Sequence, residues 1–365
     1  EGSGDPFAGA AALRGLARLR FRHPELPAVD WESFSSAAHP ALVRAVAREI
    51  LAAGAQSSGY EWAAAYAPPA PTLLSAAFVS PSLAFACGFD GAMLASRDAA
   101  RTWDLLPRFT DGALRAIAFA DEETGLAVGS FGICLRTQNG GRSWEARPRL
   151  CRQRLHALTL DTTGLGIAAG EGRAAWVTRD AGLSWERVAL SPRATVRRLA
   201  IAPGGEVWAV GDEGLLLVAH EAGRRWEKVP VPVCEDLLGV SFAGGDSGWI
   251  VGRTGTVLHS ADTGRSWQRQ RPDQRQRDFY AVCAAGTQEG WIAGGGRGSF
   301  YAPIEHTTDG GRTWTSLPSH VTDTLHDLAW NGEGVFCAVG RYGRIPQCEL
   351  VALRVLGQGD EFEPE

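Results

Sequence analysis

Basic and aromatic side chains that could bind a carboxylate recur in this chain at a fixed interval. Arg115, His156 and Arg197 follow one another at steps of 41 residues. The planar guanidinium of arginine binds a carboxylate through two parallel hydrogen bonds, and His and Tyr supply further donors. These residues therefore predict recognition of an acidic group. The candidate partner-binding residues are Arg115, Arg154, His156, Arg197, Arg253, Arg277, Tyr280, Arg297, His326, Arg341 and Arg344.

Side-chain carboxylates suggest acid–base catalysis or metal binding as a competing chemistry. Asp98, Asp180, Asp262 and Asp309, with Asn139 at the same position, each stand two residues after a Ser or Thr and five before a Trp. In such a turn the side-chain oxygen accepts hydrogen bonds from nearby backbone N–H groups. We therefore interpret these residues as hairpin locks. The histidines lack metal-binding spacing and no nucleophile or phosphate-binding motif occurs, so we expect no catalytic residue, metal or cofactor.

Tryptophan spacing indicates the elements that position these side chains. Six tryptophans, at 62, 103, 144, 185, 226 and 267, are separated by 41 residues each, and Trp314 follows after 47. A period of about 40–50 residues is typical of repeat folds, propellers included. Five of the tryptophans close a phrase such as "SADTGRSW" or "TTDGGRTW". The structural residues of this phrase are Asp98, Trp103, Asn139, Trp144, Asp180, Trp185, Asp262, Trp267, Asp309 and Trp314.

Each period contains the segments expected for one propeller blade. An apolar strand ending in Gly, such as "AFACG" or "WAVG", precedes each phrase, and another strand precedes that one. Four short strands in about 41 residues predict an all-β fold, a seven-bladed β-propeller of four-stranded antiparallel blades. The last blade lacks an outer strand, and Trp62 keeps the phase without an Asp phrase. We expect residues 60–66 to pair with residues 348–355, which closes the ring and covers a sheet edge.

The phrase S/T-x-D-x-G-x-S/T-W resembles the BNR or Asp-box repeat. Its tandem use with "VGxxG" over residues 58–356 resembles the photosystem II assembly and stability factor family and its non-photosynthetic relatives. That resemblance implies a propeller that recognises a partner polypeptide through an arginine patch, with possible association to a membrane complex. Sialidases also carry Asp boxes. The fragment Arg344-Ile345-Pro346 is similar to a sialidase motif but lies in the last blade instead of the first, so we interpret it as chance.

The two faces of the predicted disc differ in charge. The turns between first and second strands are acidic, whereas the linkers between blades and the turns after the Gly-ended strands are basic. We expect the residues at the second position of each first strand to ring the mouth of the central channel on the basic face. They either plug the channel or dock an acidic partner. They are Leu74, Arg115, His156, Arg197, Leu238, Tyr280 and His326.

These observations favour a non-enzymatic scaffold or assembly factor. Its basic face would bind a protein partner with an acidic or carboxylate-bearing surface, and we expect the free protein to be monomeric. A formal net charge of −5 argues against a nucleic-acid partner. Two alternatives stay open. One is a glycan-binding or sialidase-like glycoside hydrolase propeller, and the other is an adaptor that joins two partners.

The ends of the chain do not follow the repeat. Residues 1–57 contain two amphipathic helical patterns, residues 58–356 hold the propeller, and residues 357–365 form an acidic tail expected to be disordered. The helical segment would serve the adaptor alternative. No stretch is long and apolar enough to span a membrane. Seven cysteines without paired spacing favour a reducing compartment, whereas the family resemblance favours the periplasm or lumen, so the compartment stays open.

Overall fold

A computed structural model describes residues 61–64, 70–172, 174–191, 195–244, 246–270, 277–296, 302–317, 324–341 and 353–356. The chain divides into two compact units, Trp62–Val355 and a second that comprises Glu1–Glu61 with Leu356–Glu365. The helical segment expected over residues 1–57 and the acidic tail at 357–365 lie outside the described residues. The following account concerns Trp62–Val355.

Six four-stranded antiparallel sheets, here called blades 1 to 6, are each built from four consecutive strands. Blade 1 holds β2 (Leu73–Phe78), β3 (Ala84–Gly88), β4 (Met93–Ser96) and β5 (Asp104–Leu105). Blade 2 holds β6 (Leu114–Phe119), β7 (Thr124–Gly129), β8 (Cys134–Gln138) and β9 (Glu145–Arg147). Blade 3 holds β10 (Leu155–Leu160), β11 (Gly166–Gly170), β12 (Ala174–Thr178) and β13 (Glu186–Ala189).

The same order continues in the next three blades. Blade 4 holds β14 (Val196–Ile201), β15 (Val207–Gly211), β16 (Leu215–His220) and β17 (Arg225–Lys228). Blade 5 holds β18 (Leu237–Phe242), β19 (Gly248–Gly252), β20 (Val257–Ser260) and β21 (Gln268–Gln270). Blade 6 holds β22 (Arg277–Ala284), β23 (Gly290–Gly296), β24 (Ile304–Thr307) and β25 (Thr315–Leu317).

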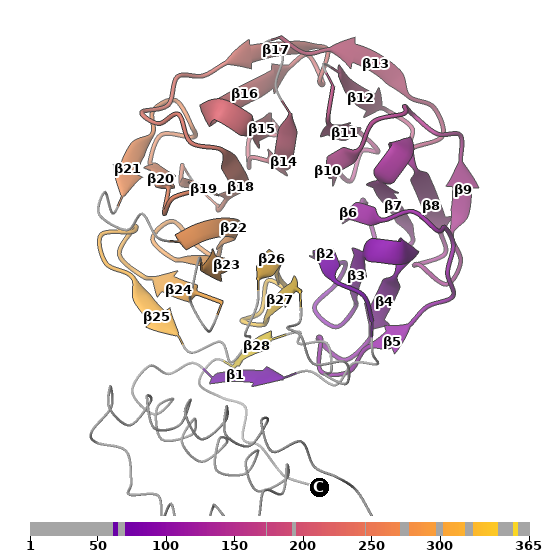
Figure 1. Cartoon of the computed structure of the whole chain (residues 1–365), viewed down its shortest axis with the longest axis horizontal. Coiled ribbons are helices and arrows are strands. Elements are labelled where there is room, and N and C mark those ends of the chain that lie inside the picture. The colour runs from indigo at the N-terminus through magenta and orange to yellow at the C-terminus, as the bar shows by residue number, and fades with distance from the viewer. Residues whose placement is uncertain are drawn as a thin grey trace, which may run out of the picture. The chain divides into compact units, whose positions relative to one another are not determined.

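A further four-stranded sheet, here called the closing sheet, draws its strands from both ends of the propeller sequence. Its order is β1 (Glu61–Ala64), β28 (Leu353–Leu356), β27 (Phe336–Gly340) and β26 (Leu325–Trp330). The strand that contains Trp62 thus lies beside the strand near the C-terminal end, where the sequence places it. The sheets are arranged as a ring with β2, β6, β10, β14, β18, β22 and β26 innermost (Figure 1), and β26 contacts β2. The predicted all-β propeller of four-stranded antiparallel blades is confirmed.

The core lies between blades because the second strand of each blade is buried on both faces. Trp208 and Trp249, in β15 and β19, are 5% and 0% exposed. Each ring faces a glycine in the Asp box of the following blade. A Cβ atom added at Gly264 would lie 2.6 Å from the Trp208 ring, and one at Gly311 would lie 2.6 Å from the Trp249 ring. The Gly of the Asp box is therefore needed for blade-to-blade packing as well as for the turn.

The Asp boxes are closed hydrogen-bonded hairpins between the third and fourth strands. In blade 5, Ser260 Oγ donates to Asp262 Oδ1 at 2.8 Å, and the Ser266 N–H donates to the same oxygen at 2.8 Å. Trp267 Nε1 donates to the Gly264 carbonyl oxygen at 2.9 Å. Asp98, Asn139, Asp180 and Asp309 accept the corresponding backbone N–H in their own hairpins. These side chains are thereby occupied in holding the hairpins.

The seam between the closing sheet and blade 1 differs from the other seams in residue size. Ala100 takes the Asp-box place that glycine holds in blades 2 to 6, and Cys337 takes the second-strand place of Trp208 and Trp249. Both are buried in one apolar cluster. Asn331 Nδ2 also donates to the Pro81 carbonyl oxygen at 3.1 Å across this seam.

Candidate partner-binding surface

A β-bulge occurs at the same place in the innermost strand of every sheet. In blade 4, for example, Val196 pairs with Gly211 and Arg198 with Val210, so that Arg197 is the extra residue. A bulge breaks the alternation of side chains and re-aims the extra residue. The bulge residues, all half-buried, are those predicted from the sequence to form a ring: Leu74, Arg115, His156, Arg197, Leu238, Tyr280 and His326.

The glycine that ends each second strand allows this bulge. A Cβ atom at Gly211 would lie 2.0 Å from the Thr195 carbonyl oxygen, and the corresponding glycines of the other sheets are equally crowded by backbone. The next residue, Asp212, donates its N–H to that same carbonyl at 3.1 Å. The start of the innermost strand and the turn after the second strand therefore lie together on one face, here called the bulge face.

The bulge-face turns of blades 1, 2, 4 and 5 each contain two successive residues with left-handed backbone angles. Asp90 and Gly91 have φ of +55° and +68°, and Phe131 and Gly132 have φ of +56° and +65°. The turns of blades 4 and 5 have the same two left-handed residues, Glu213-Gly214 and Thr254-Gly255. This geometry matches the twist of the paired strands. It fixes the direction of the turn side chains beside the bulge residues.

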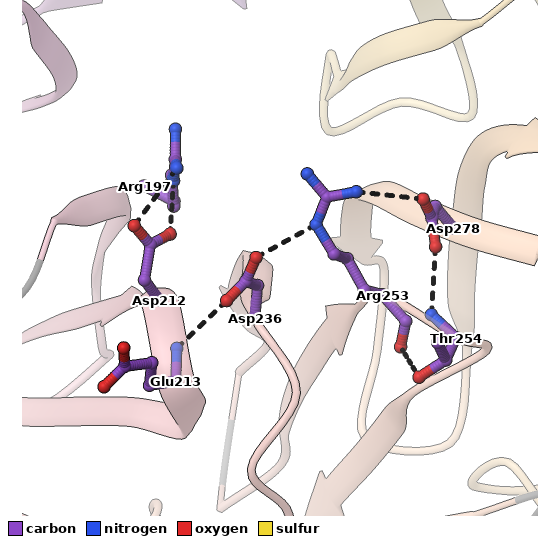
Figure 2. Close-up of polar contacts among 7 residues, drawn as sticks. All are labelled: Arg197, Asp212, Glu213, Asp236, Arg253, Thr254 and Asp278. Carbon is purple, nitrogen blue, oxygen red and sulfur yellow. Dashed lines mark hydrogen bonds and ion pairs between the residues drawn. The ribbon is translucent and has the colours of Figure 1, made fainter.

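Carboxylates neutralise several of the predicted arginines. Arg197 Nε and Nη2 donate to Asp212 Oδ1 and Oδ2 at 2.6 and 3.1 Å, a bidentate pair within blade 4 (Figure 2). Arg253 Nε donates to Asp236 Oδ2 at 3.0 Å, and its Nη1 to Asp278 Oδ2 at 3.2 Å. The sequence suggested open arginine forks. The structure shows that these two are already bound.

Asp236 and Asp278 also hold the turns of the preceding blades. The backbone N–H of Glu213 donates to Asp236 Oδ1 at 3.0 Å, and that of Thr254 donates to Asp278 Oδ1 at 2.9 Å. Figure 2 shows the resulting chain of contacts through blades 4, 5 and 6. Arg253 lies at the centre of this chain and joins blade 5 to blade 6, so two of its guanidinium nitrogens are already hydrogen-bonded within the protein.

Two more arginines of the predicted set have carboxylate partners. Arg154 Nη1 lies 3.0 Å from Glu171 Oε1, and His156 Nε2 lies 3.7 Å from the same oxygen. Arg277 Nη1 lies 2.7 Å from Glu305 Oε1, and the Glu305 side chain is 1% exposed. Sequence reasoning missed Asp236 and Glu305 as partners. For Asp236 a signal existed, since it stands directly before the first strand in the place that Asp278 occupies one blade later.

Arg115 differs from these arginines because it contacts no carboxylate of a described residue. Its Nε atom is buried and lacks a hydrogen-bond partner, and its guanidinium lies 5.8 Å from the centre of the Phe89 ring. Burial lowers the pKa of Arg115, and Arg154 and Arg197 lower it further. The same surroundings act on His156, because burial, Arg115 and Arg197 lower its pKa to about 4. Arg115, Arg154, Arg197 and His156 are here called the cationic sector. Its positive charge comes from the arginines, because the His156 imidazole is neutral at neutral pH.

The remaining predicted residues lie in other parts of the surface. Tyr280 and His326, bulge residues of blade 6 and the closing sheet, contact edge to face with ring centres 5.7 Å apart. Arg341 follows the last glycine of β27 and donates its N–H to the Thr324 carbonyl oxygen at 2.8 Å. Arg297 and Arg344 lie outside the described residues.

An ion pair crosses the propeller axis below the bulge residues. Arg198 in β14 pairs with Asp327 in β26, and Asp327 Oδ2 also accepts the Ala76 N–H of β2 at 3.0 Å. The side chain of Asp327 is 5% exposed and that of Arg198 is 21% exposed. The centre of the ring is thus occupied by a charged pair rather than open.

The described ranges provide little basis for other kinds of site. No group of three or more metal-ligating side chains is found among these residues. Helices long and apolar enough to cross a membrane are likewise absent from the described part of the chain. Six of the seven cysteines are described and are free thiols, and burial raises the pKa of Cys87, Cys283 and Cys337 to about 12. Such thiols stay protonated and serve as small apolar residues.

Comparison with known proteins adds a family to this geometry. The family model described as photosynthesis system II assembly factor YCF48 matches residues 106–197 and 218–322, more than half of the chain. No curated protein sequence matches significantly.

Three solved structures share the fold. YCF48 bound to a D1 peptide is 20% identical with a TM-score of 0.66, over 82% of this chain and 95% of that one. YCF48 from Cyanidioschyzon merolae is 16% identical with a TM-score of 0.63, over 81% and 98%. A GH74 xyloglucanase from Xanthomonas campestris is 15% identical with a TM-score of 0.63, over 78% and 53%. At these identities the likeness concerns the fold alone.

Proposed function

This chain belongs to the YCF48 family of photosystem II assembly factors, and we propose that it is a non-enzymatic assembly factor that holds a partner polypeptide on its bulge face. A solved YCF48 structure contains a D1 peptide, which supports a polypeptide as the ligand class. The partner of this chain would carry an acidic group, because the sector around Arg115 is cationic.

The proposal depends mainly on one observation, the buried Nε atom of Arg115 that lacks a hydrogen-bond partner. A guanidinium with a buried Nε atom that lacks a hydrogen-bond partner has lost hydration without full compensation. Arg154 and Arg197 stand close enough to lower its pKa, and Glu171, the partner of Arg154, offsets this only in part and forms no ion pair with Arg115. A carboxylate from a partner would supply the missing hydrogen bonds and reduce the repulsion among the three guanidinium groups.

The carboxylates of the bulge face argue against hydrolysis. A glycoside hydrolase needs two carboxyl groups free to act as acid and as base or nucleophile. Here Glu171, Asp212 and Asp278 each pair with an arginine, and Asp327 pairs with Arg198. The turn carboxylates Asp90 and Glu213 lie in blades 1 and 4, which are not neighbours, so the named carboxylates do not include an adjacent pair of free carboxyl groups. We therefore infer binding without turnover.

The test is a comparison of captured polypeptides between the protein, Arg115→Glu and a matched control, Arg101→Glu. Arg101 is exposed in the Asp-box hairpin of blade 1, so its reversal makes the same charge change away from the bulge face. Polypeptides identified by mass spectrometry would be purified and titrated against all three proteins. We expect a partner that binds the protein and the control but not Arg115→Glu. Equal binding by Arg115→Glu, or turnover of a glycoside, would overturn the proposal.

The adaptor hypothesis concerns residues 1–57, which lie outside the described residues, and it stays a prediction. Deleting those residues would remove one of two captured partners if the hypothesis holds. Retention of every partner would contradict it while leaving the bulge-face proposal intact.

A further inference from the structure

Two aromatic side chains on the bulge face are exposed to solvent. Phe89 is 41% exposed in the turn of blade 1, and Phe131 is 58% exposed in the turn of blade 2. Among the described residues, two other large apolar side chains are exposed to a comparable degree, Leu105 and Leu183. Those two lie on or next to outer strands. The phenylalanines therefore present apolar surface from the turns of two neighbouring blades on one face.

The backbone conformation of Phe131 also has an energetic cost. Its φ of +56° lies in the left-handed region, which bulky residues rarely adopt. The equivalent positions hold Asp90, Gly172, Glu213 and Thr254, of which Asp90 and Gly172 are common turn residues and none is aromatic. An exposed ring gains little packing to offset this strain. Strained residues that survive without a folding benefit are concentrated at binding sites.

Arg115 joins this aromatic patch to the cationic sector. Its guanidinium lies 5.8 Å from the centre of the Phe89 ring. The acidic side chain four residues earlier, Asp111, pairs instead with Arg108, with Nη1 and Oδ1 3.7 Å apart. A cation without an ion-pair partner among the described residues thus stands over the exposed Phe89 ring, at the start of the same blade whose turn carries Phe131.

We propose that Phe89, Phe131 and Arg115 form a docking surface for an extended peptide segment that carries an Asp or Glu side chain next to a large apolar side chain. The inference rests on the proposed function and specifies its ligand. Arg115 binds the acidic side chain, and the two phenylalanine rings cover the apolar one. An internal acidic residue fits better than a terminal carboxylate, because the chain can then continue past Arg115 over both blades.

The experiment is a selection from a randomised peptide library with acetylated N-termini and amidated C-termini, so that side chains supply the only carboxylates. The baits are the protein, Phe131→Asn, Arg115→Gln and the control Leu183→Asn, which removes an exposed apolar side chain from the rim of blade 3. We expect the protein and the control to enrich an acidic residue beside a large apolar one. Phe131→Asn should lose the apolar preference, and Arg115→Gln the acidic one.

The selected peptides are then titrated individually. Each of the two variants should bind them about tenfold more weakly than the control does, as expected for loss of a central contact. Asn suits the left-handed turn position, so weaker binding by Phe131→Asn cannot come from unfolding, and its thermal midpoint is measured alongside.

The outcomes separate this inference from the proposed function. If the protein selects one motif and both variants keep it, a peptide binds elsewhere, and the inference fails while the proposed function stands. If no peptide is enriched by the protein, both fail. Enrichment of basic peptides, or sedimentation showing that the patch instead pairs two copies of the chain, would also overturn the inference.

Discussion

Arg198 and Asp327 form an ion pair although their strands, β14 and β26, are not neighbours in the ring. Asp327 also accepts the N–H groups of Ala76 and Leu328 at 3.0 and 2.9 Å. One carboxylate therefore links β26 to β2 across the closing seam and to β14 across the axis. Arg198 and Asp327 thus tie together strands that the sheets alone leave separate.

Removing either partner should destabilise the propeller strongly. Arg198→Met leaves Asp327 as a buried charge without a counterion, and we expect a loss of about 3–5 kcal/mol in the free energy of unfolding. Urea unfolding measures this loss. The control is Asp104→Asn, because Asp104 and Arg97 form an exposed pair at 3.8 Å that should contribute at most about 1 kcal/mol. Equal effects of the two substitutions would contradict the role given to the axial pair.

Gly211→Ala should be among the most damaging single-methyl additions in the protein. The new Cβ would lie 2.0 Å from the Thr195 carbonyl oxygen, so the bulged strand has to move away. We expect a loss of at least about 3 kcal/mol, measured by urea unfolding. Gly244→Ala serves as the control, because a Cβ at Gly244 meets nothing within 4 Å. A mild effect at Gly211 would show that the bulge tolerates a larger residue.

Phe131→Asn should stabilise the fold. The substitution places a residue suited to the left-handed region at φ of +56°, and it removes strain of roughly 1 kcal/mol. A higher thermal midpoint is the expected result. Phe89→Asn is the matched control: Phe89 is also exposed but does not have a positive φ, so no gain is expected there. A lower midpoint for Phe131→Asn would mean that the ring contributes to folding.

Acid should weaken the Asp boxes. Hydrogen bonds from Thr313 lower the pKa of Asp309 to about 2, and the pKa values of Asp98, Asp180 and Asp262 are also lowered. Between the folded value and an unfolded value of about 3.9, the unfolded chain binds more protons. The free energy of unfolding therefore falls as the pH falls from about 4 to about 2.

The natural amide at Asn139 provides a comparison for this pH effect. Asp309→Asn should flatten the pH dependence of the urea midpoint, because the amide does not titrate in this range. Asn139→Asp should steepen it. An unchanged slope in both variants would indicate that other carboxyl groups control acid unfolding.

The sequence predicted the features that repeat with the blade. The tryptophans up to Trp267 and the strand-ending glycines up to Gly252 recur every 41 residues, because each blade needs the same hairpin and the same close approach of backbones. The same period identified the bulge residues, since they share one place in each innermost strand. The pairing of the Trp62 strand with the strand near the C-terminal end was predicted correctly, because Trp62 lies 41 residues before Trp103 although no Asp box precedes it.

Contacts between blades were not predictable in this way. Arg198 and Asp327 are 129 residues apart, and no local pattern pairs them. The bidentate pair of Arg197 with Asp212 depends on a bulge and a left-handed turn that together bring the two side chains face to face. Charge counts along the sequence therefore overstated the open arginines of the bulge face. The left-handed backbone of Phe131 was not predictable either, because the charge of the turns after the Gly-ended strands does not indicate their backbone angles.

At the closing seam the larger Ala100 replaces a glycine and the smaller Cys337 replaces a bulky residue, so the two ends of the ring are complementary in size. Each of the five seams between blades 1 to 6 sets a large residue against a glycine, as with Trp208 and Gly264. Blade 1 offers a methyl group in the place of that glycine, and only a small partner such as Cys337 fits against it. A ring that closed early, on blade 5 or 6, would force Trp249 or Trp291 onto Ala100. The volumes of these two side chains thus favour closure of the ring at the junction of the closing sheet with blade 1.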